Sequence, residues 1–534
     1  MRPIRHPVLA SGLALLLVLT GSGPATAGPG GPNTDALERE QNAGALARQP
    51  YAGALARTWA ADTWRSMAAM VAPQTGVPAD NIDGDLSPAS RSRYTSPTNI
   101  GSYMWSAITA RELRIIGERE QTDRIARVLT ALERMPRHAD SGQYFNWYDP
   151  QTLEMLRTWP TTGDPVEPFL SSVDNSWLAA ALMVTRNAVP RLRVRADRLL
   201  ASMDFGFYYD PAARGADFPA GLMRGGFWVE PPTQCSTLGN YRDRGPDVYY
   251  TCHHYGAFNS ETRMISYVAI SLGQVPPAHY FAPWRTFPNT CDWAWQEMRP
   301  IGEERTYYGV PVFEGAYRYR GIQFVPSWGG SMFEVLMPNL FVPEERWGRD
   351  SWARNHPAFV RGQIEHGMVD AGYGHWGFSP ASDPFAQYRE YGVDAMGLDT
   401  PGYTSDRERT SVDYGFAGCP DRAPQPEPAA YGDGVVTPHA VFLAARFAPA
   451  ESVRELLRLR DQFDVYGPGG FYDSVAVRSG TVAKRYLALD QGMIMGALGN
   501  LLGGDVLRDA FSRGGAERLL RPAMAVDEFS VPAP

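Results

Sequence analysis

Apolar residues recur at three- and four-residue spacing along most of the chain, which is the pattern of amphipathic helices packed against a core. The helices that this pattern predicts cover residues 53–72, 100–118, 121–135, 174–188, 190–204, 259–271, 331–341, 437–447, 450–462 and 489–501. No linker is recognisable after Tyr51. Paired helices without a linker indicate one all-α domain over residues 51–534, built as an α/α toroid with a cleft at one end.

Long segments rich in aromatic residues, Gly and Pro separate the predicted helices, for example 205–258 and 367–432. Loops of this length in a compact domain are usually functional. Flat rings pack against sugar rings, while polar neighbours bond the sugar hydroxyls. The aromatic residues that stand among polar residues and Gly are Tyr144, Trp147, Tyr148, Trp228, Trp328, Tyr373, Trp376, Tyr388, Tyr391 and Tyr472. As a set, they favour a carbohydrate-binding cleft, although core packing is the alternative for each ring alone.

The first residues have the pattern of a signal peptide. Arg2 and Arg5 precede an apolar run, and Ala25-Thr-Ala27 supplies small residues for a cleavage site. We therefore expect a signal peptide at 1–27, a flexible lead-in rich in Gly, Pro and Ala at 28–50, and a secreted protein of the extracellular space or cell envelope. No later segment reaches the length of a membrane span.

Charge and cysteine content exclude some partners. The net charge is -8 without a basic block, which argues against a nucleic-acid partner. The four cysteines do not have zinc-site spacing, and in an exported chain they indicate disulfides. Of the three possible pairings, we favour Cys235 with Cys252, across a loop rich in Gly and Arg, which leaves Cys291 with Cys419.

Four acidic residues with apolar or aromatic neighbours are the candidates for chemistry: Glu261, Glu334, Asp490 and Asp174. Glycoside hydrolysis needs one carboxyl that stays protonated and a second that stays ionised, and apolar surroundings separate their pKa values. The alternative for Glu261, Asp174 and Asp490 is a structural role at a helix start. Glu334 lies in an apolar stretch, where it must be paired, protonated or facing a cleft.

An ordered set of motifs resembles the family that contains bacterial endo-β-1,2-glucanases and the glucoamylase-like domain of cyclic β-1,2-glucan synthases. The resemblance covers most of the chain after the signal peptide. Its motifs are Tyr94-Thr-Ser-Pro-Thr-Asn-Ile-Gly101, Phe145-Asn-Trp-Tyr-Asp149, Ser171-Ser-Val-Asp174, Asn259-Ser-Glu-Thr-Arg263, Ile270-Ser-Leu-Gly-Gln-Val-Pro276, Ser331-Met-Phe-Glu-Val-Leu-Met-Pro338, Trp376-Gly-Phe-Ser379, Tyr388-Arg-Glu-Tyr-Gly392 and Leu489-Asp-Gln-Gly492.

The resemblance implies an (α/α)6 barrel that cleaves a β-linked glucan or a related glycan without a cofactor. We also expect no metal site. The resemblance implies that Glu261 is the general acid, with Glu334 or Asp490, and behind them Asp174, as the second carboxylate. It does not fix whether the reaction inverts or retains the anomeric configuration. The residues that we expect to bind substrate are Asn99, Tyr148, Arg263, Trp328, Trp376, Tyr388 and Tyr391. We expect endo action by a monomer.

Two departures from the family pattern concern the substrate. The chain has Asn175-Ser-Trp177 where the family tends to have Ser-Gly-Asn, and the loop at 228–258 has no counterpart that we recognise. Loops set the subsites on a shared scaffold, so β-1,2-glucan is one of several possible substrates.

Two other functions remain open. A polysaccharide lyase would use His253, His254 or Tyr255 as the base, and a non-catalytic envelope protein would bind glycan without cleaving it. The segment Asp80-Asn-Ile-Asp-Gly-Asp85 partly matches a calcium loop, but it lacks the remaining ligand spacing, so we expect a solvated turn there.

Overall fold

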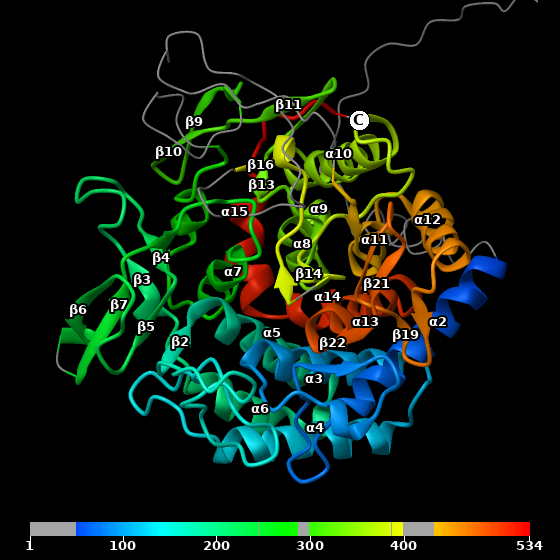
Figure 1. The fold of residues 1–534 in the computed structure, drawn as a ribbon. Coiled ribbons are helices and arrows are strands. Elements are labelled where there is room, and N and C mark those ends of the chain that lie inside the picture. Colours follow the sequence, from blue (N-terminus) through cyan, green and yellow to red (C-terminus); the bar gives the residue numbers. More distant parts are fainter. Residues whose placement is uncertain (1–49, 244, 287–297, 386, 399–431, 534) are drawn as a thin grey trace, which may run out of the picture.

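The computed structural model describes residues 50–533 except 244, 287–297, 386 and 399–431, and it is mostly helical (Figure 1). The helices are α2 (Pro50–Ala69), α3 (Pro97–Glu112), α4 (Glu118–Arg134), α5 (Ser172–Ala188), α6 (Arg193–Ala201), α7 (Arg263–Ser271), α8 (Met332–Leu336), α9 (Glu344–Trp347), α10 (Trp352–Glu365), α11 (Pro438–Ala444), α12 (Pro449–Gln462), α13 (Ala488–Leu502), α14 (Val506–Ser512) and α15 (Arg521–Ala525). The predicted signal peptide, lead-in and Cys291–Cys419 pairing lie outside the described residues.

Each helix predicted from periodicity overlaps a helix of the structure. Four helices were not predicted: α9, α10, α14 and α15. In α10, Pro357 lies inside the helix, and proline normally ends a helical pattern. The helix predicted from 259 begins only at Arg263, so Glu261 lies in the turn before it.

Six helices, namely α3, α5, α7, α8, α11 and α13, are buried along most of their length. Helix α3 packs on α5, α5 on α7, α8 on α11, α11 on α13, and α13 returns to α3. The outer helices α4 and α12 pack on α3 and α11, and each buries one face only. A helix that is buried on all sides belongs to the interior, so the molecule has an inner and an outer helical layer.

Glycine allows α13 to approach α3 closely. A Cβ atom at Gly492 would lie 2.6 Å from the Cβ of Ser102, and one at Gly499 would lie 2.5 Å from the Oγ1 of Thr109. Side chains at these two positions would push the helices apart. The close approach holds Asp490, in the first turn of α13, near the start of α3.

Short strands occupy the connections between the helices, so the all-α prediction describes the helical body but not the loops. Two small sheets project on the left in Figure 1: β2 (Phe169–Ser171), β5 (Gly226–Trp228), β7 (Asp247–Thr251) and β6 (Ser236–Asn240) in that order, and β3 (Tyr209–Asp210), β4 (Leu222–Arg224) and β8 (His254–Tyr255). In the first sheet, Phe169 pairs with Trp228. The structure contains the favoured disulfide between Cys235 and Cys252, which joins the ends of β6 and β7.

The remaining strands form small sheets of two or three. They are β1 (Asn81–Asp83) with β22 (Arg485–Leu487), β9 (Glu304–Tyr307) with β10 (Val310–Phe313), β11 (Tyr317–Tyr319) with β12 (Ile322–Phe324), β13 (Ser327–Trp328) with β16 (Gly397–Leu398), β14 (Ala381–Ser382) with β15 (Tyr388–Arg389), β18 (Tyr466–Gly467) with β19 (Gly470–Phe471), and β17 (Val435–Val436) with β20 (Ser474–Ala476) and β21 (Thr481–Ala483). None of the described helices combines the length and the apolar character that crossing a membrane requires.

Candidate active site

The four predicted carboxylates lie at the starts of buried helices. Asp174, Glu334 and Asp490 occupy the first turns of α5, α8 and α13, and Glu261 lies two residues before the start of α7. The start of a helix carries partial positive charge, which favours acidic side chains. Glu334 and Asp174 raise the pKa of Glu261, whereas the charged neighbours of Asp490 are Asp473 and Asp80.

Glu261 and Glu334 form the centre of the site. The backbone N–H of Glu261 donates to Oε2 of Glu334 at 2.6 Å, and Nε1 of Trp177 donates to Oε2 of Glu261 at 2.8 Å. Burial, and then repulsion from Glu334, raise the pKa of Glu261 well above its usual range. Burial also raises the pKa of Glu334, to about 7. Glu261 therefore holds a proton at neutral pH that it can donate.

Arg263 is buried and cannot bind substrate as we expected. Its guanidinium pairs with Glu344, at 2.7 Å from Nε to Oε1, and donates to the backbone oxygens of Glu334 at 2.7 Å and Val335 at 2.6 Å. A buried arginine of this kind requires a paired carboxylate. Arg263 therefore ties the start of α7 to α8, and it positions the two glutamates relative to each other.

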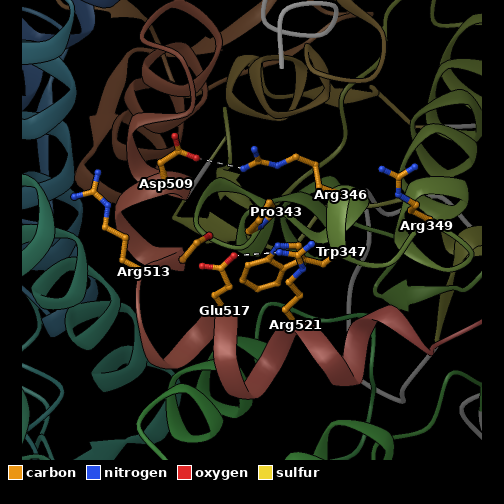
Figure 2. Close-up of a pocket in the computed structure, with 9 residues that line it drawn as sticks. Pro343, Arg346, Trp347, Arg349, Asp509, Arg513, Glu517 and Arg521 are labelled. Carbon is orange, nitrogen blue, oxygen red and sulfur yellow. Dashed lines mark hydrogen bonds and ion pairs between the residues drawn. The ribbon is translucent and has the colours of Figure 1, made fainter. Parts of the chain in front are cut away.

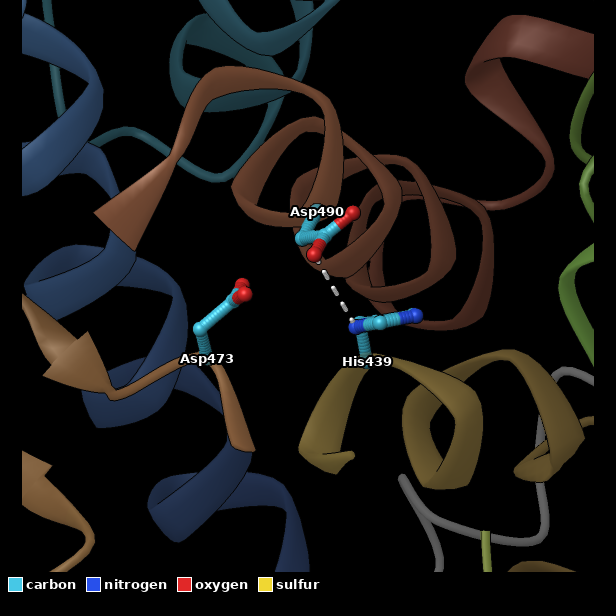
Figure 3. A group of neighbouring side chains, drawn as sticks. All are labelled: His439, Asp473 and Asp490. Carbon is cyan, nitrogen blue, oxygen red and sulfur yellow. Dashed lines mark ion pairs between the residues drawn. The ribbon is translucent and has the colours of Figure 1, made fainter. Parts of the chain in front are cut away.

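Asp490 faces two residues that we did not predict, Asp473 and His439 (Figure 3). Nδ1 of His439 lies 3.5 Å from Oδ2 of Asp490, and all three side chains are buried. Burial, and then repulsion from Asp473, raise the pKa of Asp490 well above its usual range. Burial lowers the pKa of His439 to about 3, so the imidazole is neutral. Ionisation of Asp473 therefore makes ionisation of Asp490 less favourable, as in other pairs of neighbouring carboxyls.

The same three residues have the spacing of metal ligands, since one ligand atom from each lies within 4.8 Å of the others. A neutral imidazole and two carboxylates are suitable ligands for a divalent cation. A proton shared by Asp473 and Asp490 also accounts for the arrangement, because it removes one of the two buried charges.

Asp174 and Asp80 extend the cluster toward α3. Oγ1 of Thr98 donates to Asp174 at 2.6 Å, and Asn99 donates to Oδ1 of Asp80 at 2.7 Å. Burial raises the pKa of both carboxyls. The prediction of a solvated turn at Asp80 was wrong, because the residues after it form β1, which pairs with β22. Asn99 is itself buried, so it positions Asp80 instead of contacting substrate as we expected.

Tyr388 lies between the Glu261 part of the cluster and the part formed by Asp490 and Asp473. Its side chain is 50% exposed, yet burial of the hydroxyl and the charges of Asp490, Asp473 and Glu261 raise its pKa well above the usual range. Glu390, two residues further on, is exposed, and its charge raises the pKa of both Glu261 and Glu334. Tyr388 thus borders the carboxylates and remains a candidate for contact with substrate.

Three of the aromatic residues expected to bind substrate are buried instead. The hydroxyl of Tyr148 donates to the backbone oxygen of Pro136 at 2.6 Å, in the core. Trp376 and Tyr391 are each 2% exposed. These three rings leave no face for a sugar, so their predicted role is corrected to packing. Trp328, on β13, is half-buried and keeps part of its ring accessible.

Two residues that could serve a lyase, His254 and Arg224, are bound to a carboxylate of the protein. Nε2 of His254 lies 3.0 Å from Oδ2 of Asp210, and Arg224 pairs with the same oxygen at 2.6 Å. Burial raises the pKa of Tyr255 above its usual range, which keeps its hydroxyl protonated at neutral pH and so without the form that acts as a base. Arg224 is therefore occupied by a protein carboxylate where a lyase would need it for a uronate.

A pocket of about 360 Å³ between α9, α14 and α15 holds none of the predicted carboxylates (Figure 2). Four of its nine lining residues are arginines, and its acids are paired with two of them: Asp509 with Arg346 at 3.5 Å and Glu517 with Arg521 at 3.1 Å. Arginines engage both acids, and the contacts of these two acids do not bring them together as Glu261 and Glu334 are brought together.

Sequence reasoning missed Asp80, Asp473, His439 and Glu390 as parts of the cluster. Asp473 lies in an apolar stretch after Gly-Gly-Phe-Tyr472, which is the kind of setting that selected Glu334. The indole of Trp177 replaces a residue of the family pattern and bonds the predicted acid. The sequence shows the departure at Trp177, but the spacing of residues along the chain does not reveal the contact between Trp177 and Glu261.

Comparisons with known proteins give two family matches and one curated relative. Residues 304–513 match a family described as "Putative glucoamylase", and residues 58–207 match a family of unknown function, DUF3131. The cyclic β-(1,2)-glucan synthase NdvB of Rhizobium meliloti (strain 1021) is 25% identical over 583 aligned positions, which cover 85% of this chain and 18% of NdvB. The chain thus spans less than a fifth of the length of that relative.

Solved structures share the fold. The endo-β-1,2-glucanase of Chitinophaga pinensis, in complex with sophorotriose and glucose, has a TM-score of 0.59 at 15% identity and covers 88% of this chain and 97% of its own. The β-1,2-glucanase of Parabacteroides distasonis has a TM-score of 0.60 at 16% identity, over 88% of this chain and 60% of its own. In sequence and in fold, the chain resembles the glucoamylase-like group of endo-β-1,2-glucanases and cyclic β-1,2-glucan synthases, as its motifs indicate.

Proposed function

We propose that this chain is a secreted, endo-acting glycoside hydrolase that cleaves β-1,2-glucan. The observation that carries the proposal is the pair formed by the half-buried Glu261 and the buried Glu334, which a backbone hydrogen bond joins and whose pKa values are both raised. Acid and base catalysis on a glycosidic bond requires carboxyls whose pKa values are set by such surroundings. The glucan is suggested by the likeness to endo-β-1,2-glucanases and NdvB.

In the proposed reaction, the protonated carboxyl of Glu261 donates its proton to the oxygen of the leaving sugar. A water molecule attacks the anomeric carbon, and Asp490 or Glu334 takes the proton of that water, directly or through other groups. Trp177 holds the carboxyl of Glu261 in place through Oε2. Tyr388 is half exposed and close to Asp490 and Glu261, and it would hydrogen-bond the sugar hydroxyls.

The finer architecture is part of the same proposal. The inner and outer helical layers would form an (α/α)6 toroid over residues 51–534, and the starts of the inner helices would line a cleft between the aromatic loops. The contacts from α3 through α5 to α7, and from α8 through α11 and α13 back to α3, support it. Arg263 joins the two series, because it bonds backbone oxygens of α8 from the start of α7.

A panel of purified bacterial glycans tests the proposal, with reducing ends and product sizes measured for the wild type and two variants. We expect the wild type to release short oligosaccharides from linear β-1,2-glucan, and Glu261→Gln to lower the rate by about 10²- to 10⁴-fold. The control is Glu303→Gln, an exposed glutamate whose side chain is 75% exposed. Unsaturated products would show a lyase, and binding without cleavage would show a glycan-binding protein.

A further inference from the structure

A second pocket, of about 850 Å³, lies beside the sheet formed by β2, β5, β7 and β6, on the left in Figure 1. Its lining includes the rings of Trp147, Trp159, Phe169 and Trp228, the side chains of Glu167 and His253, and the disulfide of Cys235 and Cys252. None of the predicted carboxylates lines it, and part of its wall is the loop at 228–258 that departs from the family pattern.

The rings of this pocket are fixed by one another and by the sheet. Trp147 and Trp159 meet with centroids 5.1 Å apart, and Phe169 meets Trp228 at 4.7 Å across the β2 and β5 pair. Trp147, Trp159 and Phe169 are half-buried, so each keeps part of its surface accessible. Rings held in this way present flat apolar faces without a large loss of conformational freedom on binding.

Two polar side chains of the pocket, Glu167 and His253, could hydrogen-bond the hydroxyls of a sugar. Oε1 of Glu167 accepts a hydrogen bond from the backbone N–H of Thr233 at 2.6 Å. Its other oxygen, Oε2, is buried and has no hydrogen-bond partner among the described residues. A buried carboxylate oxygen in this state is costly unless a donor reaches it. The hydroxyl of a bound sugar is such a donor, and the exposed imidazole of His253 offers a second contact.

The charge of the pocket selects against acidic ligands. Glu167 is acidic, and none of the described lining residues is Lys or Arg. An acidic sugar would meet Glu167 without a cation to neutralise it, at an unfavourable electrostatic cost. The occupant that fits is therefore a neutral glycan.

Contacts between side chains connect the lining of the pocket to the carboxylate cluster. Phe169 begins β2, which leads directly into α5 and Asp174. Tyr94 packs edge-on against both Trp147 and Trp159, and its hydroxyl accepts from Asn81, whose side chain also donates to Asp80. Tyr94 and Asn81 therefore link the rings of the pocket to the carboxylate of Asp80.

We propose that this pocket is an accessory subsite that binds glucosyl units of a neutral β-glucan at a distance from the cleaved bond. The proposal rests on the proposed hydrolase function, and it assigns the disulfide loop to recognition of long chains. Trp159 and Trp147 stack on the sugar rings, and Oε2 of Glu167 accepts a hydrogen bond from a sugar hydroxyl.

Calorimetric binding of linear β-1,2-glucan to the Glu261→Gln protein, in which we expect slow turnover of the glucan, tests the subsite. We expect the further change Trp159→Ala to weaken binding by about three- to tenfold, the range for loss of one stacked ring. Trp159→Phe should keep most of the affinity, and Glu167→Gln should lower it without removing a ring. The matched control is Tyr308→Ala, which removes a 52% exposed ring on the β9 and β10 turn.

Hydrolysis separates the two proposals. With active protein, Trp159→Ala should raise the KM for long chains more than for the shortest chain that the wild type cleaves. Equal behaviour of Trp159→Ala and Tyr308→Ala on long chains would overturn the subsite and leave the hydrolase intact. Absence of wild-type cleavage, with binding that still depends on Trp159, would overturn the hydrolase and leave the subsite. Absence of any wild-type binding to the glucan would overturn the subsite as well.

Discussion

At the scale of single residues, the indole N–H of Trp177 controls the charge of the proposed acid. It donates to Oε2 of Glu261, a contact that favours the ionised carboxyl and opposes the rise in pKa caused by burial. Trp177→Phe removes the donor and keeps the ring. We expect the alkaline limb of the kcat/KM profile to move to higher pH, because Glu261 then keeps its proton longer.

The matched control for that change is Trp105→Phe. Trp105 is another buried tryptophan of the inner layer, but its Nε1 donates to the backbone oxygen of Gly492 instead of a carboxylate. Its replacement should leave the alkaline limb where it is. An alkaline limb that stays in place in Trp177→Phe would show that Glu261 is not the group that titrates there.

Replacing two buried aspartates, Asp490 and Asp505, by asparagine should change the free energy of unfolding in opposite directions. Burial and Asp473 raise the pKa of Asp490, so at pH 7 the folded protein bears the cost of a buried charge or an extra proton. We expect Asp490→Asn to increase the free energy of unfolding by about 1 kcal/mol while activity falls. Asp505 is buried beside Arg508 and Arg446, which lower its pKa. Asp505→Asn should lower the free energy of unfolding by about 3 kcal/mol, because it leaves the two arginines without their carboxylate.

Chemical denaturation at pH 7 and the glucan assay measure both effects. Two losses of similar size would contradict the distinction between a functional and a structural aspartate. A fully stable and active Asp490→Asn protein would remove Asp490 from the candidate bases and leave Glu334.

The sequence indicated some residues of the site and not others for a physical reason. Glu261 and Glu334 were predicted because apolar and aromatic neighbours flank them, which is a local signal. His439 and Asp473 have their roles through contacts with Asp490, from helices and strands far along the chain. Spacing along a chain does not report such contacts. For the same reason, Arg263 was expected to bind substrate although it is buried against Glu344.

At the scale of elements, Arg263 should determine how α7 and α8 sit together. Its guanidinium pairs with Glu344 and bonds the backbone oxygens of Glu334 and Val335. Arg263→Met leaves Glu344 buried without its main partner, so we expect a loss of about 3 to 5 kcal/mol in the free energy of unfolding. Arg263→Lys keeps the positive charge but not the planar guanidinium, so we expect a smaller loss in the free energy of unfolding.

The control is Arg320→Met, an arginine that is 38% exposed and pairs with Glu365 at 2.7 Å. Exposed pairs contribute little, so this change should cost less than about 1 kcal/mol. Denaturant titration of the three variants gives the comparison. Equal stability of Arg263→Met and Arg320→Met would show that α7 and α8 do not depend on this contact.

Most helices could be predicted because apolar periodicity is a property of the local sequence. Helix α10 was missed because Pro357 interrupts the pattern, and the chain accommodates the proline within the folded helix. The strands of the loops are two to five residues long and have no periodic signal of their own. They form because distant segments pair, as Phe169 does with Trp228, so tertiary context decides them.

At the scale of the whole molecule, the carboxylate cluster should make stability depend on pH. The pKa of Glu334 is raised from 4.5 to about 7. Below 4.5 the group is protonated in both states; between 4.5 and about 7 only the unfolded state loses the proton, and stability falls by roughly 1.4 kcal/mol per pH unit. The raised pKa values of Asp80 and Asp174 act in the same direction.

We therefore expect the wild type to unfold more easily at pH 7 than at pH 5. Glu334→Gln should reduce this dependence, because glutamine does not titrate, and Glu303→Gln should leave it unchanged. Thermal melts across this pH range measure both. Parallel curves for the wild type and Glu334→Gln would show that Glu334 is not held protonated in the folded protein.

The central claim is that Glu261 protonates the leaving sugar, and the chemistry of the leaving group tests it directly. We would compare Glu261→Gln with the wild type on linear β-1,2-glucan and on an oligosaccharide of the same linkage with a dinitrophenyl leaving group, which departs without a proton. The proposed role predicts a loss of about 10²- to 10⁴-fold on glucan and a much smaller loss on the aryl substrate. Equal losses on the two substrates would contradict it.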